Sequence, residues 1–138
     1  MIAGAEEDGA TIDADGEFLA TSVTKTMTAA IIFDLIDRGL LELDQPAPTL
    51  EAFPEFAHAG KMTIRHLLQH TSGLAPYQRS ERWEQGLAID PVGALDLADD
   101  LPLEWAPGVD RGYSNSGYIY LGLIADCLLY TSPSPRDS

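Results

Sequence analysis

A long apolar stretch that begins at Ser22 constrains this chain more than any other feature. From Ser22 to Gly39 the hydrophobic residues leave only a narrow polar stripe, which predicts a buried helix that ends at the glycine. Ser22 and Lys25 lie three positions apart at its start, so they share one face of the helix. A lysine amine in that place can take the proton of a serine hydroxyl and turn it into a nucleophile.

The start of this helix is a favourable place for such chemistry. The positive end of a helix and an apolar environment both disfavour a positive charge, so we expect Lys25 to be able to act as a base. The unpaired backbone N–H of Ser22 can point at a developing oxyanion. On this segment alone, a helix-capping serine followed by a solvent-facing lysine is an equal alternative.

A second polar cluster, Tyr113-Ser114-Asn115, lies far downstream. A phenol needs a neighbouring cation to act as a base at neutral pH, and Lys25 could supply it. Asn115 can bind a substrate amide while its carbonyl faces the lysine. A core tyrosine and a helix cap are the alternative roles for Tyr113 and Asn115, but the combination with Ser22 and Lys25 favours a catalytic site.

Other patterns argue against other classes of site. Thr63 predicts the N-cap of a short helix that carries His66 and His70 and ends at Gly73. The two histidines have a metal-binding spacing, but the Glu of the zinc-protease motif and a third ligand are missing, so packing and capping are the better roles. No Gly-x-Ser-x-Gly elbow and no phosphate-binding loop occurs. We expect no metal and no cofactor.

Composition narrows the class of protein further. The formal net charge of −14 would repel phosphates, so we expect no nucleic-acid partner. No apolar stretch approaches the ~20 residues that span a bilayer, and the acidic N-terminal segment lacks the features of a secretory signal. At 138 residues the chain is expected to form at most one domain, and its single cysteine, Cys127, excludes an internal disulfide.

The C-terminal part of the chain predicts two further helices and a tail. A short helix is expected over residues 88–97, interrupted or started near Pro91. Another is expected over residues 117–125, capped by Asn115 or Ser116. A Ser-Pro-Ser-Pro run then interrupts the apolar pattern without a cap. We therefore expect a partial domain over residues 1–127 and a non-native or disordered tail over residues 128–138, which resembles a translated sequencing adapter. A genuine, loose C-terminus is the alternative.

Three segments in this order closely resemble the serine beta-lactamase-like hydrolases, which include class C beta-lactamases, D-alanyl-D-alanine carboxypeptidases and related esterases. The segments are residues 21–29, with Ser-x-x-Lys, 63–74, with His-Thr-Ser-Gly, and 107–122, with Tyr-x-Asn. The likeness covers roughly residues 18–126. The Tyr-x-Asn form points to the class C-like branch rather than to the Ser-Asp-Asn branch.

The resemblance implies a fold and a set of roles. The fold would be the beta-lactamase/transpeptidase-like α/β (α+β) fold, of which this chain covers mainly the helical part, with most of the antiparallel sheet missing. Ser22 would be acylated by a beta-lactam, peptide or ester carbonyl, Lys25 and Tyr113 would shuttle the proton, and Asn115 would position substrate and lysine. Residues 63–74 would belong to the scaffold. The family also suggests a periplasmic or secreted protein with a small-molecule or peptide substrate.

One departure from the family pattern limits the expected activity. The third motif of the family, a Lys-Thr-Gly or His-x-Gly on a strand that lines the site, is expected to be absent. That strand provides the second oxyanion donor, whose loss costs on the order of 100- to 1,000-fold in rate. The apolar helix faces would also lack most of the sheet on which they pack, so we expect the chain to be poorly soluble or partly molten, with little or no activity. Tyr77, Trp83 and Trp105 are candidates for the walls of a substrate pocket.

Two other readings compete with a serine hydrolase that forms an acyl-enzyme. The first is a non-catalytic penicillin-binding-like module that binds peptidoglycan or a protein partner, and the second is a small helical interaction domain with a chance motif. The presence of Ser22, Lys25, Tyr113 and Asn115 together favours the enzyme. The sequence determines neither the compartment nor the oligomeric state.

Overall fold

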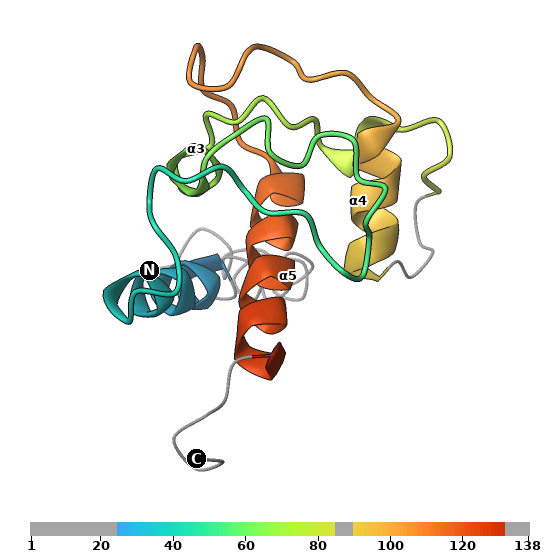
Figure 1. The fold of residues 1–138 in the computed structure, drawn as a ribbon. Helices are drawn as coiled ribbons and strands as arrows, with labels where there is room; N and C mark the ends of the chain where they lie inside the picture. Colours follow the sequence, from blue (N-terminus) through green and yellow to red (C-terminus); the bar gives the residue numbers. More distant parts are fainter. Residues whose placement is uncertain (1–24, 85–89, 132–138) are drawn as a thin grey trace, which may run out of the picture.

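The computed structural model of the chain describes residues 25–84 and 90–131 (Figure 1). In these ranges a helix over residues 25–37 is followed by α3 (Ile64–Leu68), the 3-10 turn η1 (Tyr77–Arg79), α4 (Pro91–Asp99) and α5 (Asn115–Thr131). The same ranges contain no strand, only isolated bridges that pair Pro46 with Thr63 and Leu50 with Phe53. The expectation that the chain covers mainly helical structure is confirmed.

Helix α5 is the central element. It lies between the helix over residues 25–37 and α4, while long loops cross above it (Figure 1). Its contacts with α3 and α4 hold these parts of the chain together. The buried residues of α5 recur three or four positions apart, so they form one continuous apolar face that packs against the core. They include Tyr120, Leu121, Ile124 and Ala125.

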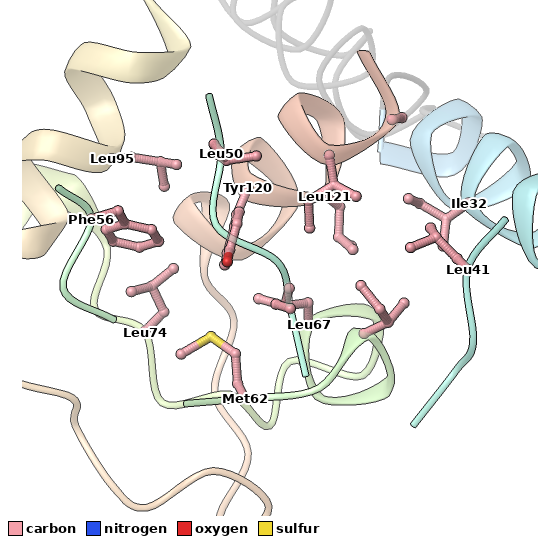
Figure 2. Packing of buried hydrophobic residues seen from close by; sticks show 14 of the residues in the cluster. Ile32, Leu41, Leu50, Phe56, Met62, Leu67, Leu74, Leu95, Tyr120 and Leu121 are labelled. Atoms are coloured by element: carbon pink, nitrogen blue, oxygen red, sulfur yellow. The ribbon is translucent and has the colours of Figure 1, made fainter. Parts of the chain in front are cut away.

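The core is one continuous hydrophobic cluster. Figure 2 shows Leu121 near its middle, with Ile32 and Leu41 to one side and Phe56 and Leu95 to the other. The ring of Tyr120 packs edge-on against Phe56, with ring centroids 5.1 Å apart. Its hydroxyl donates a hydrogen bond of 2.6 Å to the carbonyl of Pro48, so the buried phenol is satisfied. Burial raises the pKa of Tyr120.

The helix over residues 25–37 ends as the sequence predicts but is buried differently. The N–H groups of Gly39 and Leu40 donate to the carbonyls of Ile36 and Leu35, which is the Schellman arrangement, and Gly39 supplies the positive φ of 80° that it needs. The prediction of burial nearly all round is wrong for the described residues. Only one face is covered, and the other face is exposed at Met27, Ile31 and Phe33.

Local capping signals explain where the other helices begin. Thr63 is the N-cap of α3, and it forms a capping box with His66: each side chain accepts a hydrogen bond from the other residue's backbone N–H. The capping role expected for the histidines is therefore confirmed for His66. Asp90 caps α4, which begins at Pro91, as one of the two predicted alternatives has it, and ends at Asp99, two residues later than expected.

Helix α5 is longer at both ends than the 117–125 expected from the sequence. It begins at Asn115 and continues to Thr131, and Leu128 packs against the core. The helix thus includes the first residues of the predicted tail, while residues 132–138 lie outside the described ranges. Within the described residues, no helix is long and apolar enough to cross a membrane.

Candidate functional site

Two of the four predicted site residues are in direct contact. The amine of Lys25, in the first described turn of its helix, lies 4.9 Å from the centre of the Tyr113 ring. Tyr113 belongs to the segment just before α5, and its side chain is 60% exposed. A cation over a phenol ring is attracted by the negative face of the ring. The contact brings together two segments that are far apart in the sequence.

Asn115 faces the same space from the start of α5. Its side-chain oxygen is buried and has no hydrogen-bond partner among the described residues, and Asn115 lines a cavity of about 620 Å³ that Lys25 also lines. The side-chain oxygen of Gln78 has the same two properties. A buried acceptor without a donor costs free energy, so two of them around one cavity indicate a place for a ligand that donates hydrogen bonds.

Gln78 was missed by the sequence analysis. It lies in the 3-10 turn η1, where no repeated pattern or spacing marks it, so only the folded chain connects it with Lys25 and Asn115. Of the three predicted aromatic walls, Tyr77 lines the cavity. Trp83 instead packs edge-on against Tyr77, and Trp105 supports the backbone before Tyr113.

The rest of the cavity is mainly apolar. The lining comes from the helix over residues 25–37 on one side and from α5 on the other, with one acidic residue, Asp126, among the apolar ones. A mostly apolar cavity with a few polar groups that converge is typical of a small-molecule site. The apolar lining residues include Ile31, Ile119, Leu123 and Leu129.

The backbone before α5 is held in place by three hydrogen bonds to the segment after α3. The N–H groups of Glu104, Gly108 and Gly112 donate to the carbonyls of Gly73, Thr71 and His70, at 2.7, 2.8 and 2.9 Å. We call these three bonds the neck. They fix the approach of the chain to Tyr113.

The indole of Trp105 supports the neck. Its N–H donates to the carbonyl of Thr71 at 3.2 Å. A Cβ on Gly112 would lie 2.6 Å from the Trp105 ring, so only glycine fits at position 112 as the chain is packed. The aromatic ring predicted as a pocket wall therefore acts on the backbone that leads to Tyr113.

Electrostatic effects at the site are concentrated on His70 and Tyr118. Burial, with smaller contributions from the cations Lys25 and Arg111, lowers the pKa of His70. Burial raises the pKa of Tyr118, and the neighbouring Tyr113 adds to that effect. Both groups are therefore held in their neutral forms near neutral pH.

One of the four predicted site residues is not described by the structure. Ser22 lies outside the described residues, so its role as nucleophile stays a prediction. The described part of the chain contains no group of three His, Cys, Asp or Glu side chains that could hold a metal ion.

The prediction that no His-x-Gly occurs needs a correction, because residues 58–60 read His-Ala-Gly. They form a turn rather than a strand. His58 is buried, and its Nε2 atom lies 2.8 Å from the carbonyl oxygen of Leu101. None of the three residues lines the cavity. The His-Ala-Gly sequence at residues 58–60 is therefore not the strand motif of the family.

The chain has a beta-lactamase/transpeptidase-like fold, of which the described residues form a helical part. The family described as Beta-lactamase matches residues 3–127, and the chain belongs to that family. A structure titled as a D-stereospecific amidohydrolase from Streptomyces sp. aligns with a TM-score of 0.64 and 25% identity, over 78% of this chain and 36% of that one. The penicillin binding protein from Bacillus halodurans aligns with a TM-score of 0.62 and 30% identity, over 77% and 33%.

Curated relatives lead to the same family. "Penicillin-binding protein 4" from Amycolatopsis lactamdurans is 32% identical over 87% of this chain and 32% of its own length. "Esterase EstB" from Burkholderia gladioli is 35% identical over 78% of this chain and 31% of its own length. The chain thus spans about a third of the length of these two relatives, one named as a penicillin-binding protein and the other as an esterase.

Proposed function

We propose that the chain carries the acyl-transfer machinery of a serine hydrolase, with Ser22 as nucleophile, Lys25 and Tyr113 as the proton-transfer pair and Asn115 as the substrate-positioning amide. The observation that carries the proposal is the 4.9 Å contact between the Lys25 amine and the Tyr113 ring. The amine lies over the face of the ring, so in the proposed reaction it moves to the phenol hydroxyl, and the two groups share the work of accepting and returning one proton. The cavity beside them gives a substrate room to approach.

The proposed reaction has two steps. In the first, the proton of the Ser22 hydroxyl passes to the Lys25–Tyr113 pair while the serine oxygen attacks the substrate carbonyl. The pair then returns the proton to the leaving amine or alcohol, and an acyl-serine ester forms. In the second step, water gives a proton to the same pair and attacks the ester. The pair then returns that proton to the Ser22 oxygen as the ester bond breaks, which releases the acid and restores the Ser22 hydroxyl.

The orphaned acceptors favour a substrate with an amide N–H. The side-chain oxygens of Asn115 and Gln78 are both buried, receive no hydrogen bond from the part of the chain that the structure describes, and belong to residues that line the cavity. An N–H group beside the scissile carbonyl would satisfy one or both of them. This favours an amide, peptide or beta-lactam over a simple ester within the range of small-molecule and peptide substrates.

The expected rate is low. No Lys-Thr-Gly or His-x-Gly follows Asn115 in this sequence, so the second oxyanion donor that the family strand provides has no counterpart. Loss of one such donor costs on the order of 100- to 1,000-fold. We expect slow formation of the acyl-serine and little or no turnover by the chain of 138 residues.

Covalent labelling tests the proposal because it needs one reaction event and no turnover. The folded chain is incubated with a fluorescent penicillin and, separately, with a fluorophosphonate, and the adduct is measured by intact-mass spectrometry. We expect one slow adduct, which Ser22→Ala abolishes and the control Ser80→Ala retains. An adduct that persists in Ser22→Ala would contradict the assignment. Failure of both probes to label a folded chain would instead favour a non-catalytic module that binds peptidoglycan or a protein partner.

A further inference from the structure

His70 makes contacts that exceed the packing role expected from the sequence. Its ring stacks on the ring of Tyr113, with centroids 4.8 Å apart and planes 27° apart. The same ring lies 5.1 Å from the ring of Tyr118, at 30°. An imidazole thus connects the tyrosine of the proposed proton-transfer pair with α5, which Tyr118 anchors by a hydrogen bond of 2.9 Å to the carbonyl of Leu68.

The polar atoms of His70 hold both neighbours of Tyr113. The N–H of Gly112 donates to the His70 carbonyl at 2.9 Å, and the N–H of Ser114 donates to the Nδ1 atom of the ring at 3.3 Å. His70 has a φ of 61°, which turns the chain sharply after α3. Three contacts from one residue thus fix the position of Tyr113, although its side chain is largely exposed.

The hydrogen bond to Ser114 also fixes the protonation state that His70 needs. An Nδ1 atom that accepts from an N–H cannot itself carry a proton, so the ring is neutral with its proton on Nε2. The charged and titratable groups around the ring are Lys25 from its helix, Arg111 and Tyr113 from the segment before α5, and Tyr118 from α5. The two cations oppose a further positive charge on the imidazole.

We propose that neutral His70 is a positioning residue for the acyl-transfer reaction, which holds the Tyr113 ring in reach of the Lys25 amine through ring stacking and the Ser114 hydrogen bond. This inference rests on the function proposed above. A proton on Nδ1 would turn the acceptor into a donor that faces the Ser114 N–H. The bond would break, and the Tyr113 segment would lose one of its three contacts with His70.

The first test needs neither a variant nor activity. The pKa of His70 lies below its ordinary value of 6.5, so protonation occurs on acidification below that pH. We expect the NMR signals of the Tyr113 ring and the Ser114 amide to shift together with the His70 ring signals in that titration. Tyr113 and Ser114 signals that stay constant while His70 titrates would overturn the proposal, whether or not Ser22 reacts.

The second test compares two histidine variants. His70→Asn keeps an acceptor oxygen and tolerates a positive φ, but it removes the ring and the titration. We expect its labelling rate to fall about 10- to 100-fold, because small misplacements of reacting groups cost that much, and the low-pH shift of Tyr113 to disappear. The control His66→Asn should keep the wild-type labelling rate and the low-pH shift of the Tyr113 signals. A labelling rate equal to wild type in His70→Asn would show that His70 has no part in positioning, and absence of labelling in every chain would count against the proposed function alone.

Discussion

Helix α5 and the helix over residues 25–37 have comparably apolar sequences but very different surroundings. In α5, Tyr120, Leu121 and Ile124 are almost completely buried. The other helix buries Ile32 and Leu35 on one face, while Phe33 on its opposite face is 53% exposed. The proposed site lies between these two helices, so Asn115 stands on a firmly packed element and Lys25 on one that is held by a single face.

The difference shows what an apolar pattern can and cannot predict. The apolar pattern predicts how much of a helix surface should be buried. Whether that surface is buried depends on which other segments of the chain pack against it. Within the described residues, α5 receives that cover from α3, α4 and the long loops, whereas the outer face of the other helix receives none. Substitutions in one of the two helices, compared with substitutions in the other, test whether α5 is packed more completely than the helix over residues 25–37.

The largest expected effect is at the centre of the packed region. Tyr120→Ala removes a fully buried ring, its edge-on contact with Phe56 and its hydrogen bond to Pro48. We expect the free energy of unfolding to fall by about 3–5 kcal/mol. Urea unfolding followed by circular dichroism measures the change.

Phe33→Ala is the matched control on the one-faced helix. Its ring is 53% exposed, so the free energy of unfolding should change by about 0.5 kcal/mol or less. A loss as large as that of Tyr120→Ala would show that the outer face of this helix is covered in solution, and the contrast between the two helices would fail.

A pair of glycines sharpens the comparison at the backbone. Gly39 and Gly73 have nearly the same positive φ, but a Cβ at Gly39 meets nothing within 4 Å, whereas a Cβ at Gly73 lies 2.3 Å from the Trp105 carbonyl oxygen. Gly39→Ala should cost about 1–2 kcal/mol, from the left-handed backbone alone. Gly73→Ala should cost about 1–3 kcal/mol more, because the neck must shift. Equal thermal-unfolding losses for the two variants would contradict the close contact.

A smaller effect is expected at the start of α3. Thr63→Ala removes one half of the capping box with His66, so the free energy of unfolding should fall by about 1 kcal/mol. Thr63→Ser keeps the hydroxyl and should restore most of the loss. Chemical denaturation of the three chains in parallel measures both changes, and no recovery with serine would show that the methyl group, not the cap, is responsible.

The smallest effect is expected at the solvent-facing ion pair of the one-faced helix. Arg38 and Asp34 lie 3.0 Å apart, one turn from each other, and both side chains are 53% exposed. Arg38→Gln should change the free energy of unfolding by about 0.5 kcal/mol or less, and added salt should reduce even that difference. A salt-independent loss above 1 kcal/mol would mean that this face is shielded from solvent.

Much of the local structure could be predicted from sequence because its causes are local. The Schellman stop at Gly39 and the cap at Thr63 depend on residues within one or two turns, and both are confirmed. Helix bounds failed where the signal was weak: α5 begins at Asn115 itself and extends past the predicted end. The family and the helical content were also correctly inferred from three ordered motifs.

The parts that failed or were missed depend on contacts between distant segments. The exposed side of the helix over residues 25–37 depends on which segments reach it. Gln78 has no local signature, and its place at the cavity results from the packing of η1 beside α5. The contact between Lys25 and Tyr113 was expected on chemical grounds. The role of His70, whose ring packs between Tyr113 and α5, could be recognised only from the stacked rings.

The neck has a consequence for how the protein can vary. The N–H of Glu104 donates a hydrogen bond to the carbonyl of Gly73, so the segment over residues 74–103 begins and ends at adjacent points. This excursion of the chain carries both Gln78 and α4. The exposed residues of this excursion can therefore change, whereas Leu95 and Ala98 of α4 must stay in the core. The hydrogen bonds of the neck keep the register of the segment before Tyr113 where it is. Under the proposed function, what is recognised can thus diversify in one stretch while what reacts stays constant in another.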